Sequence, residues 1–135
     1  MEKRRSFFKQ IFSLGAAGAV LPFYNKVWAR QKSETTFIHH VFFWLKNPED
    51  PEVNKKFLKG LKEMGTIETI SLLHIGTPAD TDRPIIDNTY HYSFLIGFKD
   101  RKGHDIYQEH PIHDNFRNEY SDMWTKVLVY DSVDV

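Results

Sequence analysis

The sequence has no cysteine among its 135 residues. This absence excludes disulfide bonds and thiol chemistry, so the folded domain must be stable through its core alone. A lipid anchor on cysteine is excluded for the same reason. The chain also lacks a long apolar run: the weakly apolar stretch from Ile11 to Phe23 is shorter than the ~20 residues that span a bilayer.

An excess of positive charge is also missing. The whole chain has 18 basic and 18 acidic side chains, and residues 30–135 carry 13 basic and 17 acidic ones. Contacts with phosphates need clustered Lys and Arg, which a mildly acidic domain does not supply. The composition therefore argues against nucleic acid as a partner.

The first 29 residues have the layout of an export signal. The run Arg4-Arg5-Ser6-Phe7-Phe8-Lys9 resembles a twin-arginine motif, and Val27-Trp28-Ala29 offers a cleavage site after Ala29. We expect residues 1–29 to be a signal peptide that exports a folded bacterial protein, in most cases to the periplasm, with no membrane anchor after cleavage. A general secretory signal and an N-terminal helix of the domain are the alternatives.

Residues 30–35 form a polar leader, and residues 36–135 form one domain. The segment 36–46 alternates as a strand with two apolar faces, one carrying His39 and the other His40. Asp50-Pro51 predicts a helix start and Gly65 its stop.

Further strands are predicted at 68–77, 89–99 and 125–133, with a long connection over 77–88. In strand 89–99, one face collects the residues Tyr90, Tyr92, Phe94, Ile96 and Phe98. A short helix is expected over 104–109, and a second from Pro111 that carries Phe116, Tyr120 and Trp124 at helical spacing. This order predicts an α+β fold of the ferredoxin-like type, a four-stranded antiparallel sheet with helices on one face.

Helices on one face leave the other face of this sheet uncovered. That face carries His40, Phe42 and Trp44, and an apolar surface of this kind is unusual on a monomer. We therefore expect a homodimer in which two sheets face one another and form a barrel.

The segment from Tyr107 to His113 concentrates groups that transfer protons near neutral pH. His113 falls in the first turn of a helix, where the positive helix end favours a neutral imidazole. His39 shares its strand face with Val41 and Phe43 and is expected to point toward the helices. The alternative is that these groups only stabilise the loop and the core, with His110 capping the turn.

The chain resembles the stress-responsive α/β-barrel (Dabb) family of dimeric α/β-barrel proteins. The resemblance rests on three segments: the opening strand 38–46, the run 107–113 with its His-Pro-x-His core, and the ending 124–131. It implies a dimeric barrel with a pocket between the sheet and the helices of each subunit. Some plant members look like polyketide cyclases, in which a tyrosine–histidine pair acts near a first-strand histidine. Tyr107, His113 and His39 match these positions, and Tyr92 stands where those members have a further pocket histidine.

These patterns predict an exported dimer that binds a small carbonyl-bearing or aromatic molecule. Its chemistry would be proton transfer of lyase, cyclase or isomerase type without a cofactor, with His39, Tyr107 and His113 as catalytic residues. The expected binding residues are Val41, Phe43, Tyr92 and His110.

Two alternatives remain. One is a non-catalytic stress-response or scaffold protein. The other is a haem- or metal-binding barrel, in which His39, His91, His110 and His113 could converge, although Pro111 breaks the helical pairing of His110 with His113. His74 and His104 carry no separable signal.

Overall fold

The structure is a computed structural model that describes residues 34–135. The predicted signal peptide and most of the polar leader lie outside the described residues. Within residues 34–135, no helix has the length and apolar character needed to cross a membrane.

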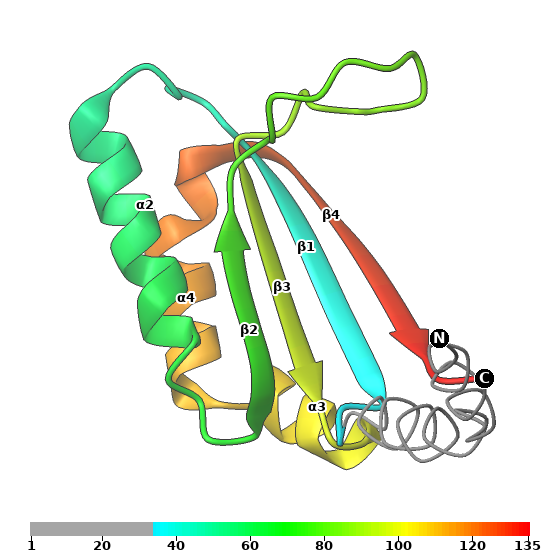
Figure 1. Ribbon diagram of the computed structural model, residues 1–135. Coiled ribbons are helices and arrows are strands. Elements are labelled where there is room, and N and C mark those ends of the chain that lie inside the picture. The colour runs from blue at the N-terminus through cyan, green and yellow to red at the C-terminus, as the bar shows by residue number, and fades with distance from the viewer. Residues whose placement is uncertain (1–33) are drawn as a thin grey trace, which may run out of the picture. The chain divides into compact units, whose positions relative to one another are not determined.

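Four strands and three helices make up the described chain, and the sheet order is β2-β3-β1-β4 with all neighbouring strands antiparallel. Figure 1 shows α2 and α4 against one face of the sheet, and α3 at the end where β1 begins and β4 ends. This arrangement confirms the predicted ferredoxin-like fold. In chain order, the elements are β1 (Phe37–Leu45), α2 (Pro51–Met64), β2 (Ile70–Gly76), β3 (Tyr92–Phe98), α3 (Arg101–Gln108), α4 (Pro111–Tyr120), a 3-10 turn (Ser121–Met123) and β4 (Trp124–Val133).

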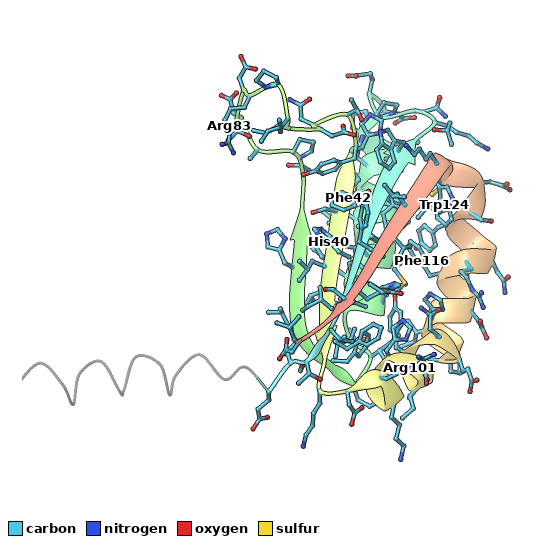
Figure 2. All side chains as sticks on the ribbon, turned by 90° about the vertical axis from the view of Figure 1, so that its right-hand side faces the viewer. His40, Phe42, Arg83, Arg101, Phe116 and Trp124 are labelled. Carbon is cyan, nitrogen blue, oxygen red and sulfur yellow. The ribbon has the colours of Figure 1, made fainter. Side chains whose placement is uncertain are left out.

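β1 is one of the two central strands, and its residues alternate between the two faces of the sheet. Its burial alternates without exception, and His39 belongs to the buried set that faces the helices. His40 and Phe42 belong to the half-buried set, and Figure 2 shows both on the side of the sheet away from α4. The predicted division of the strand into a helix face and an open face is confirmed.

Helix α2 begins and ends where the sequence predicts. The Asp50 side chain accepts a hydrogen bond from the backbone N–H of Glu52 at 2.9 Å, and Pro51 takes the first helical position. Gly65 follows the last helical residue. The helix buries Phe57, Leu61 and Met64 against the sheet.

The third strand begins later than predicted, and Tyr90 lies on the opposite face. β3 starts at Tyr92, after a bend at His91. The backbone N–H of His91 donates to the carbonyl of Phe43 at 2.8 Å. The Tyr90 ring then contacts Phe42, with ring centroids 4.9 Å apart, on the open face. The period-two pattern failed here because the bend interrupts it.

Two helix boundaries also differ from the prediction. α3 begins at Arg101 rather than at residue 104, because the Asp100 side chain caps it by accepting from the N–H of Gly103 at 2.9 Å. Trp124 is the first residue of β4 and not part of α4. Its ring still stacks on Phe116, at 5.8 Å between centroids, which explains the helix-like spacing in the sequence.

Candidate functional site

Three of the predicted site residues lie together on the helix-covered face. The Tyr107 ring of α3 lies between His39 of β1 and His113 of α4, with centroid distances of 5.8 Å and 4.7 Å. The structure thus brings together residues from three elements on one face of the sheet. Their catalytic roles remain a prediction.

The break between α3 and α4 places His113 over Tyr107. α3 ends at Gln108 and α4 begins at Pro111. Nδ1 of His110 accepts a hydrogen bond from the N–H of Ile112 at 3.1 Å, so His110 caps α4 as expected. Nδ1 of His113 lies 3.1 Å from the carbonyl oxygen of Gln108. Because a carbonyl can only accept, Nδ1 of His113 carries the hydrogen and Nε2 keeps its lone pair.

Asp131 is a site residue that sequence reasoning missed. Its Oδ1 lies 2.6 Å from Nδ1 of His39, and the two residues face each other in the β1–β4 register. A carboxylate in this position fixes the imidazole tautomer with the hydrogen on Nδ1. The Asp131 side chain is 45% exposed and that of His39 is 7% exposed. The buried imidazole therefore has a hydrogen-bond partner that solvent can reach.

His104 is the second residue that was missed. Its ring lies 5.2 Å from that of His39 and is stacked on Phe37 at 4.4 Å. Its Nε2 is 3.1 Å from Nε2 of Gln108. Tyr107 and Gln108 follow His104 by three and four residues, so the three side chains share one face of the helix. This spacing is the signal that could have placed His104 beside the site.

Burial shifts the pKa values of His39, His113 and Tyr107. It lowers the pKa of His39 below the ordinary 6.5, although the hydrogen bond to Asp131 acts in the opposite direction. Burial also lowers the pKa of His113, against the smaller opposing effect of its bond to Gln108. The same burial raises the pKa of Tyr107 well above its usual range. Near neutral pH the imidazoles of His39 and His113 are therefore neutral, and the Tyr107 phenol is protonated.

Side chains fill the space around Tyr107. The residue is 1% exposed, and its hydroxyl donates to Sδ of Met64 at 3.7 Å, its one partner among residues 34–135. Two open grooves on the described surface follow α2 and the start of α4, and both are lined by other residues. A ligand that reaches Tyr107 must displace a side chain, and the unbranched Met64 is the most adaptable one in contact.

The predicted binding residues occupy different places. Val41 and Phe43 lie in the core on the helix-covered face. Tyr92 lies on the same face, at the start of β3 and away from His39, where its hydroxyl donates to Oδ1 of Asn54 at 3.0 Å. His110 has Oε2 of Glu68 3.4 Å from its Nε2.

The histidines that the sequence offered for a metal do not form one group. Nδ1 of His91 accepts from the backbone N–H of Leu45 at 2.8 Å, near the end of β1 away from His39. Within residues 34–135, the group of side chains that could hold a metal ion consists instead of His39, His104 and Asp131, whose ligand atoms lie within 4.8 Å of one another.

The fold and the Tyr107–His113 segment define a ferredoxin-like α+β protein with a polar cluster beneath its helices. The chain belongs to the stress responsive A/B barrel domain (Dabb) family, which matches residues 37–134. No functionally curated protein matches the sequence.

Solved structures agree with this assignment. A Dabb-family protein with a ferredoxin-like fold from Mesorhizobium loti is 26% identical, with a TM-score of 0.63, and the match covers 75% of this chain and 98% of that one. A dimeric ferredoxin-like protein of unknown function from Thermobifida fusca is 15% identical, with a TM-score of 0.60, over 74% and 92%. The hydroxynitrile lyase from Passiflora edulis is 14% identical, with a TM-score of 0.62, over 76% and 96%. The last two similarities show the fold alone.

Proposed function

We propose that this protein is an exported homodimer whose subunits each bind a small carbonyl-bearing or aromatic molecule and transfer a proton on it without a cofactor. The reaction would be of lyase, cyclase or isomerase type. The observation that carries the proposal is the contact between the protonated Tyr107 phenol and the neutral His113 imidazole, 4.7 Å apart between ring centroids.

These two groups have complementary chemistry. The lone pair on Nε2 of His113 accepts a proton from carbon next to a carbonyl, or from the hydroxyl of a carbonyl adduct. The Tyr107 hydroxyl donates a hydrogen bond to the oxygen on which negative charge develops. His113 then returns the proton to a different atom of the same molecule, or to the group that leaves. His39, held by Asp131, is a second base at the same face of the sheet.

A test of this chemistry needs no knowledge of the natural substrate. Phenylacetone is a suitable probe, because it is aromatic and has exchangeable hydrogens beside its carbonyl. In D2O, the protein should accelerate the loss of the proton NMR signal from these hydrogens. Tyr107→Phe and His113→Gln should each slow this exchange by about 100-fold, the range of a positioned acid or base.

Mandelonitrile provides a lyase arm for the same experiment, because its cleavage begins with removal of a hydroxyl proton. The hydroxynitrile lyase of similar fold makes this arm worth including. Absence of both exchange and cleavage, together with no ligand-induced shift of melting temperature across a carbonyl library, would favour the scaffold alternative. The filled interior around Tyr107 is the observation that favours that alternative.

The dimer is proposed to form through the open face of the sheet. This face carries Phe42 and Trp44 of β1 and the exposed Leu72 and Tyr130 of its outer strands. Nε2 of His40, on the same face, is buried without a hydrogen-bond partner within the described subunit, and a partner subunit could supply one. The Thermobifida fusca protein of similar fold is dimeric.

Trp44→Glu should convert the dimer to a monomer or an aggregate, because it places a charge in a face expected to be dry. Light scattering measures the change. Glu49→Gln, on the loop after β1, is the matched control and should stay dimeric. A wild-type monomer at micromolar concentration would contradict the proposed interface.

Export is proposed from the leader sequence. Replacing Arg4 and Arg5 by Lys keeps the charge but removes the paired guanidinium groups, and the precursor should then stay in the cytoplasm. Fractionation of the cells measures this. Undiminished export of the double variant would leave a general secretory route as the explanation.

A further inference from the structure

We propose that His39, His104 and Asp131 form a binding site for a divalent transition-metal ion such as Zn²⁺. Two imidazole nitrogens and one carboxylate oxygen, one from each residue, already lie within 4.8 Å of one another. This donor set leaves at least one coordination position open for water or a ligand. The inference goes beyond the proposed proton transfer, which needs neither His104 nor a metal.

The pair of His39 and Asp131 requires only a small outward adjustment, and the ligand nitrogen of His104, within 4.8 Å of both, has to move inward. With bonds of about 2.0–2.1 Å, tetrahedral ligands lie roughly 3.3 Å apart. Nδ1 of His39 and Oδ1 of Asp131 are now 2.6 Å apart, as a hydrogen bond requires. An ion between them would displace the proton they share and move them apart by less than 1 Å. Asp131 can make this movement because its side chain is 45% exposed near the end of β4.

The surroundings of His104 hold it in place for this role. The Phe37 ring stacks on it at 4.4 Å, with planes 25° apart. Nε2 of His104 accepts a hydrogen bond from the Gln108 amide nitrogen at 3.1 Å, and Nδ1 lies 3.4 Å from Oδ1 of Asp105. When the ion takes the place of the Gln108 hydrogen bond on Nε2, Nδ1–H keeps Asp105 as its acceptor, as metal-ligating histidines usually do.

The three residues meet at one end of the sheet. His39 lies near the start of β1 and Asp131 near the end of β4, and Figure 1 shows α3, which carries His104, at that same end. The His39 ring also contacts Tyr107 at 5.8 Å, so an ion here would lie close to the proposed site of proton transfer.

The test is titration of the untagged, metal-free protein with Zn²⁺, followed by calorimetry, and with Co²⁺, followed by its visible absorption. We expect one ion per subunit and a Co²⁺ spectrum typical of nitrogen and oxygen ligands. His104→Gln and Asp131→Asn should each weaken Zn²⁺ binding by more than about 100-fold, since each removes a ligand rather than a supporting contact. Both positions are more exposed than His39, and circular dichroism of the metal-free variants checks that they fold.

His74→Gln is the matched control, because His74 lies on the open face of the sheet. It should bind Zn²⁺ as the wild type does. Wild-type affinity in folded His104→Gln, or no saturable binding by the wild type at micromolar Zn²⁺, would overturn the proposal. The two functions are separable: His113→Gln should keep the metal and lose proton exchange. If metal binding fails, exchange by wild-type protein still supports the proposed function.

Discussion

The helix-covered face of the sheet has two ends, and β1 contributes to both. At the end where β1 leads into α2, called the α2 end, it places Phe43 against the rings of Phe57 and Trp124, at 5.1 and 5.4 Å between centroids. At the α3 end it places His39 against Tyr107 and His104. The first end is a cluster of apolar rings and the second a cluster of titratable ones.

The apolar end of the face therefore contributes mainly to stability, and the titratable end offers groups for chemistry. The apolar rings bury surface whose removal from water stabilises the fold by about 25 cal/mol per Å². The polar rings keep hydrogen-bonding atoms available under the helices, which stabilises the fold less but can act on a ligand. Substitutions at the α2 end should therefore affect unfolding, and those at the α3 end should affect binding and pH dependence.

The largest effect is expected at Phe57. The side chain is fully buried among Phe43, Tyr92 and Phe116. Phe57→Ala leaves a cavity and should lower the free energy of unfolding by about 3–5 kcal/mol, measured by urea denaturation. Lys59→Ala, on the exposed side of the same helix, should change it by less than about 0.5 kcal/mol. If Phe57→Ala lowers the free energy of unfolding by less than about 1 kcal/mol, the α2 end does not contribute more to stability than the α3 end.

Two glycines give a matched pair, one at each end. A Cβ on Gly60 of α2 would lie 2.7 Å from the Tyr120 ring and 3.0 Å from Phe116, so Gly60→Ala should cost about 1–3 kcal/mol. A Cβ on Gly103 of α3 would meet Phe98 at 3.5 Å, an ordinary contact. Gly103→Ala should be neutral or stabilise the helix by up to about 1 kcal/mol. Equal losses in urea denaturation would contradict the closer packing of the α2 end.

The titratable end should make stability depend on pH. Burial lowers the pKa of His39 and His113 in the folded state, so the unfolded chain binds more protons below the ordinary pKa of 6.5. Their contribution is complete above that value and declines as the pH falls toward the folded-state pKa. The melting temperature should drop between about pH 7.5 and pH 5, and the drop should be smaller in His113→Gln. A pH dependence that His113→Gln leaves unchanged would assign it to other groups.

Only a small effect on stability is expected for Tyr107→Phe. The change removes a hydroxyl whose one described partner is the weak acceptor Sδ of Met64 at 3.7 Å, and the ring stays in place. The free energy of unfolding should change by less than about 1 kcal/mol, while proton exchange on phenylacetone slows. A variant that loses several kcal/mol yet keeps exchange would show that Tyr107 is a structural residue.

Local patterns predicted most of the fold, because strand alternation and helix caps act over a few residues. Asp50-Pro51 and Gly65 defined α2 in this way. Tyr90 was placed on the wrong face because the bend at His91 depends on hydrogen bonds to the distant strand β1.

The site was predictable only in part, for the same physical reason. Tyr107 and His113 share one short segment, so the sequence shows them together. The partnership of His39 with Asp131 depends on the register of two strands far apart in the chain. The helical spacing of His104 to Tyr107 is a local signal, but its contact with His39 depends on where α3 lies at the end of the sheet.

The pairing of β1 with β4 also sets the order in which the molecule can be completed during synthesis. A ribosome adds Asp131 92 residues after His39, and β1 lacks one neighbour until then. Contacts this far apart in sequence close slowly, because a long loop must be ordered before they stabilise anything. Until β4 is made, the edge of β1 that pairs with it has no partner strand, and the His39–Asp131 pair forms only when β4 joins the sheet.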